Sequence, residues 1–165
     1  PSFGKIIVGG IDYDKLPDRN IPLLRRKIGV VFQDFKLLPT RNVFENVAFA
    51  LEVSGMTNKE IKRTVPKVIE LVGLKGKEKS FPHELSGGEQ QRVSIARAIA
   101  HSPKILFADE PTANLDSESS AMVLKIFQEL NAEGQTIVMV THEDEYGDAT
   151  DRVIFLKDGQ LSDER

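Results

Sequence analysis

Residues 104–112 read KILFADEPT, in which a short apolar run at 104–108 is followed by two adjacent carboxylates, Asp109 and Glu110. Apolar runs of the same kind occupy residues 27–32 (KIGVVF) and 136–141 (TIVMVT). Continuous runs of this length are typical of strands that are buried on both faces of a parallel sheet. Helical patterns separate the runs along the chain, and this alternation predicts an α/β fold with a mainly parallel sheet.

Several helices in the sequence have recognisable ends. Thr57 and Ser86 are each followed three residues later by a glutamate, which is the capping-box pattern of a helix N-terminus. Ser117 is expected to open another helix, which ends before Gly134. Pro66 lies within the helix that Thr57 opens, and we expect it to kink or shorten that helix.

The chain has 165 residues, enough for one domain and little more. Helical sequence dominates between the first and second apolar runs. We therefore expect a single domain over residues 1–165, in which a helical subdomain at about 41–101 is inserted into a core of residues 1–40 and 102–165.

The two ends of the chain favour small β elements. Residues 5–11 predict an edge strand, and residues 152–161 predict a hairpin that turns at Asp158-Gly159. The chain begins with Pro1 and not with methionine, so we expect the natural protein to extend further in the N-terminal direction.

Composition excludes several classes of function. The 22 basic and 25 acidic residues leave a net charge of -3, which gives no support to electrostatically driven nucleic-acid binding. Cysteine is absent, which excludes disulfides, thiolate zinc sites and cysteine nucleophiles. No apolar run approaches the roughly 20 residues needed to cross a bilayer, and the first residues do not resemble a signal peptide.

Polar side chains follow each of the three apolar runs. Gln33 follows the first, Asp109 and Glu110 follow the second, and His142 follows the third. Each is a weak signal alone, because a glutamine after a strand is usually a loop residue and a lone histidine is more often structural. Ligands of open α/β sheets bind beyond the carboxyl ends of the strands, so the coincidence of these residues predicts a site there.

Asp109 and Glu110 form the sharpest pair. Adjacent carboxylates at the end of an apolar strand repel each other unless a cation or a proton compensates. On an extended backbone their side chains point to opposite sides, so one could hold Mg²⁺ while the other activates a water molecule. The alternative is an exposed acidic loop.

Residues 85–89 (LSGGE) place two glycines in the first turn of a predicted helix. Each glycine costs about 1 kcal/mol relative to alanine inside a helix, which indicates that something approaches the backbone closely. Because a helix N-terminus attracts anions, the pattern predicts a phosphate site. The alternative is a serine cap followed by glycines that have no ligand.

Taken together, and in their order along the chain, these motifs resemble those of ABC-type ATPase domains, and the resemblance covers essentially the whole chain. Residues 32–39 (FQDFKLLP) and 46–51 (NVAFAL) are most similar to the FtsE subfamily of cell-division ATP-binding proteins, and ATPases of lipoprotein release and macrolide export are also similar. The matching motifs are the Q-loop at Gln33, the signature at 85–92 (LSGGEQQR), Walker B at 105–112 (ILFADEPT), the D-loop at 114–116 (NLD) and the switch histidine at 141–142 (TH).

The resemblance implies a role for each of these residues. Asp109 and Gln33 would hold Mg²⁺, Glu110 would polarise the attacking water, and His142 would contact the γ-phosphate of ATP. The residues expected to meet the nucleotide of the opposite subunit, or the dimer interface, are Ser86, Gly87, Gly88, Glu89 and Asp116.

The resemblance also implies partners. It predicts a head-to-tail homodimer with ATP and Mg²⁺ as cofactors, located at the cytoplasmic face of the plasma membrane. An integral membrane partner, FtsX-like in this subfamily, would touch residues 34–43 after Gln33, and no nucleic acid is expected.

One departure from the family pattern is serious. The phosphate loop G-x-x-x-x-G-K-[ST] is absent from this sequence and would lie upstream of Pro1. We therefore expect an N-terminally incomplete core that alone binds ATP poorly and hardly hydrolyses it. The alternatives are a non-catalytic interaction module derived from the family, and a DNA-repair or chromosome-organising ATPase, which the lack of heptads and of a basic patch disfavours.

Overall fold

The structure is a computed structural model that describes residues 4–8, 10–143, 147 and 150–164. At its centre is a sheet of three parallel strands in the order β3-β4-β5. These strands coincide with the three apolar runs, so the predicted α/β fold with a parallel sheet is confirmed. Their bounds are β3 (Ile28–Val31), β4 (Ile105–Asp109) and β5 (Thr136–Val140).

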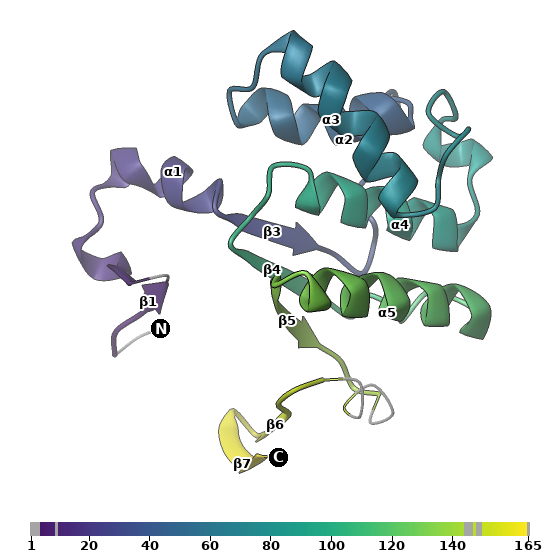
Figure 1. Cartoon of the computed structure of the whole chain (residues 1–165). Helices are drawn as coiled ribbons and strands as arrows, with labels where there is room; N and C mark the ends of the chain where they lie inside the picture. The colour runs from purple at the N-terminus through teal and green to yellow at the C-terminus, as the bar shows by residue number, and fades with distance from the viewer. Residues whose placement is uncertain (1–3, 9, 144–146, 148–149, 165) are drawn as a thin grey trace.

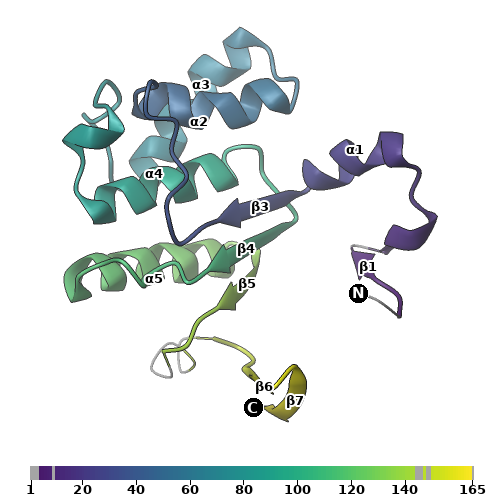
Figure 2. The same ribbon diagram turned by 180° about the vertical axis from the view of Figure 1, so that it is seen from behind.

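Helices form two layers beside this sheet. In Figures 1 and 2, α4 and α5 lie against the sheet, and α2 and α3 lie beyond α4. The α-helices are α1 (Ile21–Arg25), α2 (Val43–Val53), α3 (Asn58–Leu71), α4 (Gly87–Ile99) and α5 (Ser117–Ala132), and the short 3-10 turns are η1 (Tyr13–Lys15), η2 (Asp18–Asn20) and η3 (Pro82–Glu84).

Only one face of the sheet is covered by described residues. A side chain at Gly29 would collide with the backbone oxygen of Ala98, so α4 lies directly against β3 on this face. The opposite face carries a cross-strand row of Val30, Phe107 and Val138, which are 36%, 36% and 43% exposed. Figure 2 looks onto this uncovered side. The expectation that the strands are buried on both faces is therefore wrong here, because α4 and α5 share a face.

The helix ends follow the local sequence with two corrections. Both predicted capping boxes form, at Thr57 with Glu60 and at Ser86 with Glu89. α3 runs through Pro66 to Leu71, so Pro66, which is exposed, does not shorten the helix, and a kink at this residue stays a prediction.

The second correction concerns the start of α5. The helix is capped by Asp116 and not by Ser117, because the Asp116 carboxylate accepts the backbone N–H of Ser119. Gly134, with φ of +95°, follows its C-terminal end as expected.

Two antiparallel hairpins lie at the ends of the chain. Residues predicted as one edge strand form β1 (Ile7–Val8) and β2 (Ile11–Asp12), which pair with each other. The predicted C-terminal hairpin consists of β6 (Ile154–Lys157) and β7 (Gln160–Glu164). Asp158 and Gly159 both have positive φ, 51° and 76°, as the two-residue turn requires.

A continuous buried core joins the helical layers to the sheet. Its apolar side chains come from β3 and β4 as well as from α2, α3, α4 and α5. The signature helix α4 packs on β3 and also on α2 and α3, so it links the two parts. Within the described residues, none of the helices is long and apolar enough to cross a membrane.

Candidate functional site

The carboxyl edge of the sheet brings Glu110 and His142 together. β4 and β5 pair so that Asp109 lies opposite Val140, and the backbone N–H of Glu110 donates to the Val140 oxygen at 2.9 Å. His142 follows two residues after Val140, and its Nδ1 lies 2.9 Å from the Glu110 Oε1. The two residues predicted as catalytic are therefore in direct contact.

This contact favours the protonated form of the histidine. The Glu110 carboxylate accepts a hydrogen bond from the His142 Nδ1–H, and this bond, together with the negative charge of the carboxylate, raises the pKa of His142 above its usual value. The side chain of His142 is 73% exposed, whereas that of Glu110 is 21% exposed. The Oε2 atom of Glu110 is buried and makes no hydrogen bond within the described part of the chain. One oxygen of Glu110 thus holds the imidazole, while the other is buried and has no hydrogen-bond partner among the described residues.

The backbone at Glu110 differs from the expected extended strand. Its φ is +45°, in the left-handed region, which costs a residue with a side chain about 1–2 kcal/mol. The strand ends at Asp109, and the chain then turns, with the Ala113 N–H donating to the Glu110 oxygen at 3.3 Å. The orientation of Glu110 relative to Asp109 is therefore set by this turn and not by the pleat of the strand.

Gln33 lies two residues beyond the end of β3, in a loop held against the segment after β4. The amide of Asn114 donates to the Gln33 backbone oxygen at 3.2 Å. Both Gln33 and Asp109 are exposed. One carboxylate and one amide oxygen suit Mg²⁺, which usually takes one or two protein ligands besides phosphate oxygens and water. The described residues contain no group of three or more His, Asp or Glu side chains that could hold a metal ion.

Ser86 and Glu89 at the start of α4 are occupied by each other. The Glu89 N–H donates to the Ser86 Oγ at 3.2 Å, and the Ser86 N–H donates to the Glu89 Oε2 at 2.9 Å. That backbone hydrogen bond lowers the pKa of Glu89, and Lys77 lies 3.2 Å from its other oxygen. Both side chains therefore cap the helix, and a nucleotide contact by them stays a prediction.

The two glycines that follow have different surroundings. A Cβ atom at Gly88 would lie 2.7 Å from the Cβ of Ser119 and closer still to its Oγ, whereas a Cβ at Gly87 would meet atoms at ordinary distances of 3.7–3.8 Å. At Gly88 the close neighbour in this structure is Ser119 in the first turn of α5, and a phosphate contact at this glycine stays a prediction. At Gly87 a Cβ atom would make only ordinary van der Waals contacts, so packing within this chain does not explain this glycine.

Asp116 is engaged within its own chain. Its Oδ1 accepts the Ser119 N–H at 2.9 Å and its Oδ2 accepts the Ser119 hydroxyl at 3.0 Å, and these hydrogen bonds lower the pKa of Asp116. Its predicted place at a dimer interface remains a prediction. Ser119, which joins this cap to Gly88, was missed in the sequence because nothing in its local pattern distinguishes it from any serine in a first helical turn.

Gln91 is a second residue that sequence reasoning missed. It is fully buried on α4, and its Nε2 donates to the Pro111 oxygen at 2.7 Å, just beyond Glu110. A buried glutamine on an apolar helix face, within the signature motif, is the signal that could have identified it.

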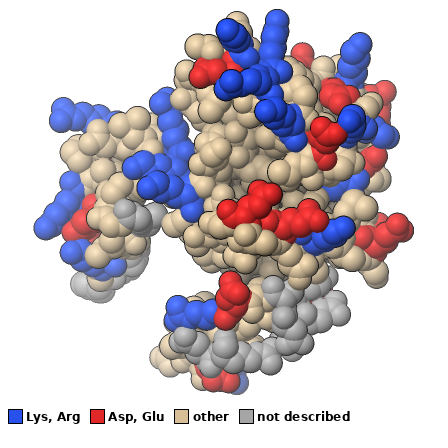
Figure 3. Space-filling view, viewed as in Figure 1, with Lys and Arg blue, Asp and Glu red and all other residues tan. Residues whose placement is uncertain are grey.

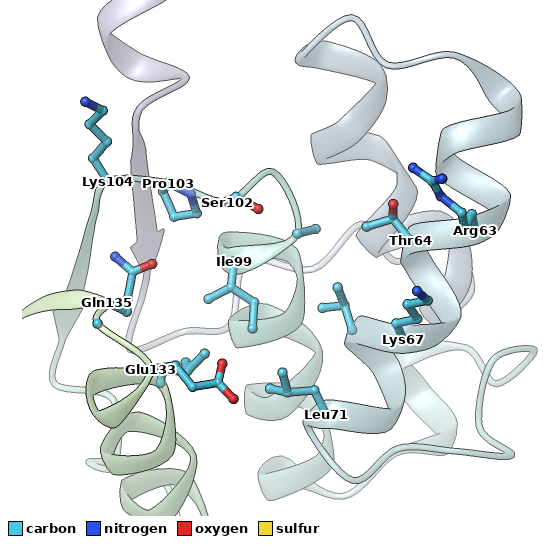
Figure 4. Close-up of a pocket in the computed structure, with 14 residues that line it drawn as sticks. Arg63, Thr64, Lys67, Leu71, Ile99, Ser102, Pro103, Lys104, Glu133 and Gln135 are labelled. Carbon is cyan, nitrogen blue, oxygen red and sulfur yellow. The ribbon is translucent and has the colours of Figure 1, made fainter.

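A pocket of about 750 Å³ lies away from these residues, at the amino ends of β4 and β5 (Figure 4). It separates α3 from the C-terminal ends of α4 and α5, and Arg63, Lys67, Lys104 and Glu133 contribute its charges. Figure 3 places many Lys and Arg side chains over α3 and Asp and Glu side chains over α5. None of the predicted site residues lines this pocket, so it is separate from the carboxyl edge of the sheet.

Comparison with known proteins identifies the relatives of the chain. Residues 1–113 match the family model described as ABC transporter. The Cell division ATP-binding protein FtsE of Bacillus subtilis (strain 168) is 52% identical over 160 residues, which cover 96% of this chain and 70% of the relative. The Methionine import ATP-binding protein MetN of Carboxydothermus hydrogenoformans is 46% identical over 166 residues, which cover 99% of this chain and 49% of that relative.

A solved structure has the same fold. The dimeric ATP-binding cassette MJ0796, in a post-hydrolysis state bound to ADP and Pi, superposes with a TM-score of 0.88 and is 36% identical. The match covers 100% of this chain and 74% of that one. With a family model over more than half of its length and relatives of this identity, the chain belongs to the ABC transporter family.

Proposed function

We propose that this chain is part of the ATP-hydrolysing subunit of an ABC-type membrane complex, FtsE-like in its role in cell division. The observation that carries the proposal is the contact between Glu110 and His142 at the carboxyl edge of the sheet, 2.9 Å long. The FtsE relatives, which are 46–52% identical, support the subfamily.

The proposed chemistry assigns one task to each group at this edge. Asp109 and Gln33 would hold Mg²⁺, and the bound ion would neutralise charge on the phosphate oxygens. Glu110 orients a water molecule and accepts its proton, and its place beside His142 at the carboxyl edge of the sheet supports this role. His142, held through Nδ1, presents its Nε2 to the γ-phosphate, and its raised pKa favours the protonated donor form.

The uncovered face of the sheet indicates where the helix that follows a phosphate loop would pack. Parallel sheets in α/β proteins carry helices on both faces, and here Val30, Phe107, Val138 and Val140 are left exposed. A phosphate loop lies between a strand and a helix, and we propose that this helix packs on the exposed row in the complete protein. In this proposal, that helix covers the second face of the sheet. It thereby completes the core of residues 1–40 and 102–165, into which the helical subdomain at about 41–101 is inserted.

The signature helix points to a second subunit. We propose a head-to-tail homodimer in which the start of α4 meets the nucleotide of the opposite subunit, and the dimeric MJ0796 cassette supports this arrangement. Residues 34–43 contact an FtsX-like integral membrane partner, at the cytoplasmic face of the plasma membrane. The N-terminal backbone N–H groups of α4 supply the anion attraction. The residues assigned to this contact are Ser86, Gly87, Gly88, Glu89 and Asp116.

The test of the proposed function is Glu110→Gln in the complete protein. We expect ATP to bind normally and phosphate release to fall by roughly 10²–10⁴-fold, the usual contribution of a positioned general base. Glu118→Gln, an exposed glutamate in the first turn of α5, is the matched control. Near-normal hydrolysis by Glu110→Gln would show that Glu110 is not the base, and an inactive wild-type protein would favour the non-catalytic interaction module.

A further inference from the structure

The loop after Gln33 is held by an arginine of the signature helix. Arg97 lies near the C-terminal end of α4, 61 residues along the chain from Lys36. Its Nη1 donates to the backbone oxygen of Lys36 at 2.6 Å, and its Nη2 donates to that of Phe35 at 3.0 Å. One guanidinium therefore binds two consecutive carbonyl groups of a distant loop.

The backbone that Arg97 binds is in an unfavourable conformation. Phe35 and Lys36 have φ values of 57° and 49°, both in the left-handed region, and neither is a glycine. Consecutive left-handed residues turn their carbonyl groups in the same direction, which suits the planar fork of an arginine. Because residues with side chains disfavour this region, the turn needs an external contact to hold it.

The partial burial of Arg97 supports the same role. Burial lowers the pKa of its guanidinium, and within the described part of the chain it has no carboxylate partner. A partly desolvated charge loses some of its contact with water, and the two carbonyls of the loop compensate this arginine for that loss. Its position is therefore tied to the left-handed turn and not to an ion pair.

Two other side chains bind the start of the same loop. Gln91 of α4 donates to the Phe32 oxygen at 3.5 Å, and Asn114 donates to the Gln33 oxygen at 3.2 Å. Both donors also lie close to Glu110. Asn114 follows it by four residues in the chain, and Gln91 also donates to the backbone oxygen of Pro111, the residue after Glu110. The backbone on either side of Gln33 is thus fastened to α4 and to the loop that carries the proposed base.

We propose that Arg97 is a positioning residue that holds Phe35 and Lys36 in the left-handed turn and so makes the orientation of Gln33 follow the position of α4. Since α4 carries the signature residues at its other end, a movement of this helix shifts both ends together. The inference rests on the proposed ATPase for its effect on catalysis, but the clamp itself is a property of this chain.

The experiment is Arg97→Lys in the full-length protein. Lysine keeps the charge but lacks the planar fork, so it cannot hold both carbonyls in the same geometry. We expect the backbone amides of Phe35 and Lys36 to exchange their hydrogens about tenfold faster, which corresponds to the loss of one hydrogen bond from a charged donor. The kcat of ATP hydrolysis should fall by a similar factor while the KM for ATP changes by less than about twofold. Arg63→Lys, on the exposed side of α3, is the matched control and should change neither.

A rescue separates positioning from general damage. Glycine enters the left-handed region without the steric cost, so Lys36→Gly added to Arg97→Lys should restore most of the amide protection and of the kcat. If Arg97→Lys changes neither quantity, or if Lys36→Gly restores neither, the proposal is overturned.

Two further results keep the outcomes distinct. If the wild-type protein hydrolyses no ATP, the proposed function fails, while hydrogen exchange still tests the clamp. If Arg97→Lys does not fold, NMR of the wild-type protein decides: couplings across hydrogen bonds from the Arg97 guanidinium to the two carbonyls support the clamp, and a freely rotating guanidinium overturns it.

Discussion

Gly88→Ala tests why the signature helix begins with two glycines. A Cβ atom at position 88 would lie 2.7 Å from the Cβ of Ser119, and closer still to its Oγ, so α4 and α5 would have to move apart. The neighbouring change, Gly87→Ala, places its Cβ at 3.7–3.8 Å from the nearest atoms and requires no movement. The two variants differ by one position in the same helical turn, which makes Gly87→Ala a matched control.

The expected magnitudes follow from packing and helix propensity. Overpacking costs typically about 1–3 kcal/mol, and the helix preference of alanine over glycine returns up to about 1 kcal/mol. Gly88→Ala should therefore lower the free energy of unfolding by about 1–2 kcal/mol, whereas Gly87→Ala should leave it unchanged or raise it slightly. For chains of this size, about 2–4 °C of thermal midpoint corresponds to each kcal/mol.

The assay is urea and thermal unfolding of both variants of the complete protein. Ser119→Gly removes the Cβ and Oγ that collide and leaves its Cα at 3.7 Å, so the double variant should be more stable than the sum of the single changes by at least about 1 kcal/mol. Equal stability of Gly88→Ala and Gly87→Ala, or no coupling to Ser119→Gly, would refute the packing explanation. A close ligand would then be the better reason for Gly88.

Three further outcomes are expected. The present chain, incubated with Mg²⁺ and ATP, should release phosphate far more slowly than the ordinary enzyme range of about 1 s⁻¹ or above, because it lacks a phosphate loop; turnover of that order would contradict this. NMR titration should give His142 a pKa above 6.5, and Glu110→Gln should bring it back toward that value. Because the pKa of His142 is raised in the folded state, the stabilisation from this pair is complete below pH 6.5 and is lost as the pH rises through the folded pKa. A stabilisation that instead increases with pH over this range would refute the pairing. Gly87→Asp should block ATP-driven dimerisation, followed by light scattering, while the monomer still binds ATP; a joint loss of both would place the helix end at its own nucleotide.

Local pattern was enough to predict the architecture and the edge of the sheet that carries the site. The runs at 27–32, 104–108 and 136–141 became parallel strands, since an uninterrupted apolar run of strand length has few other stable arrangements. The capping boxes at Thr57 and Ser86 formed because their donors and acceptors lie within three residues of one another. Glu110 and His142 could be placed together because the carboxyl ends of parallel strands meet at one edge.

The tertiary structure decided the contacts between residues that no periodicity of the local sequence relates. The left-handed turn at Glu110 depends on its bond to Val140 of the neighbouring strand. The need for glycine at position 88 depends on how closely α5 packs on α4. Arg97 reaches a loop 61 residues away. Sequence periodicity specifies which side of an element is apolar, but such contacts arise only when two elements are packed at a given distance and angle, and that geometry is a property of the whole core.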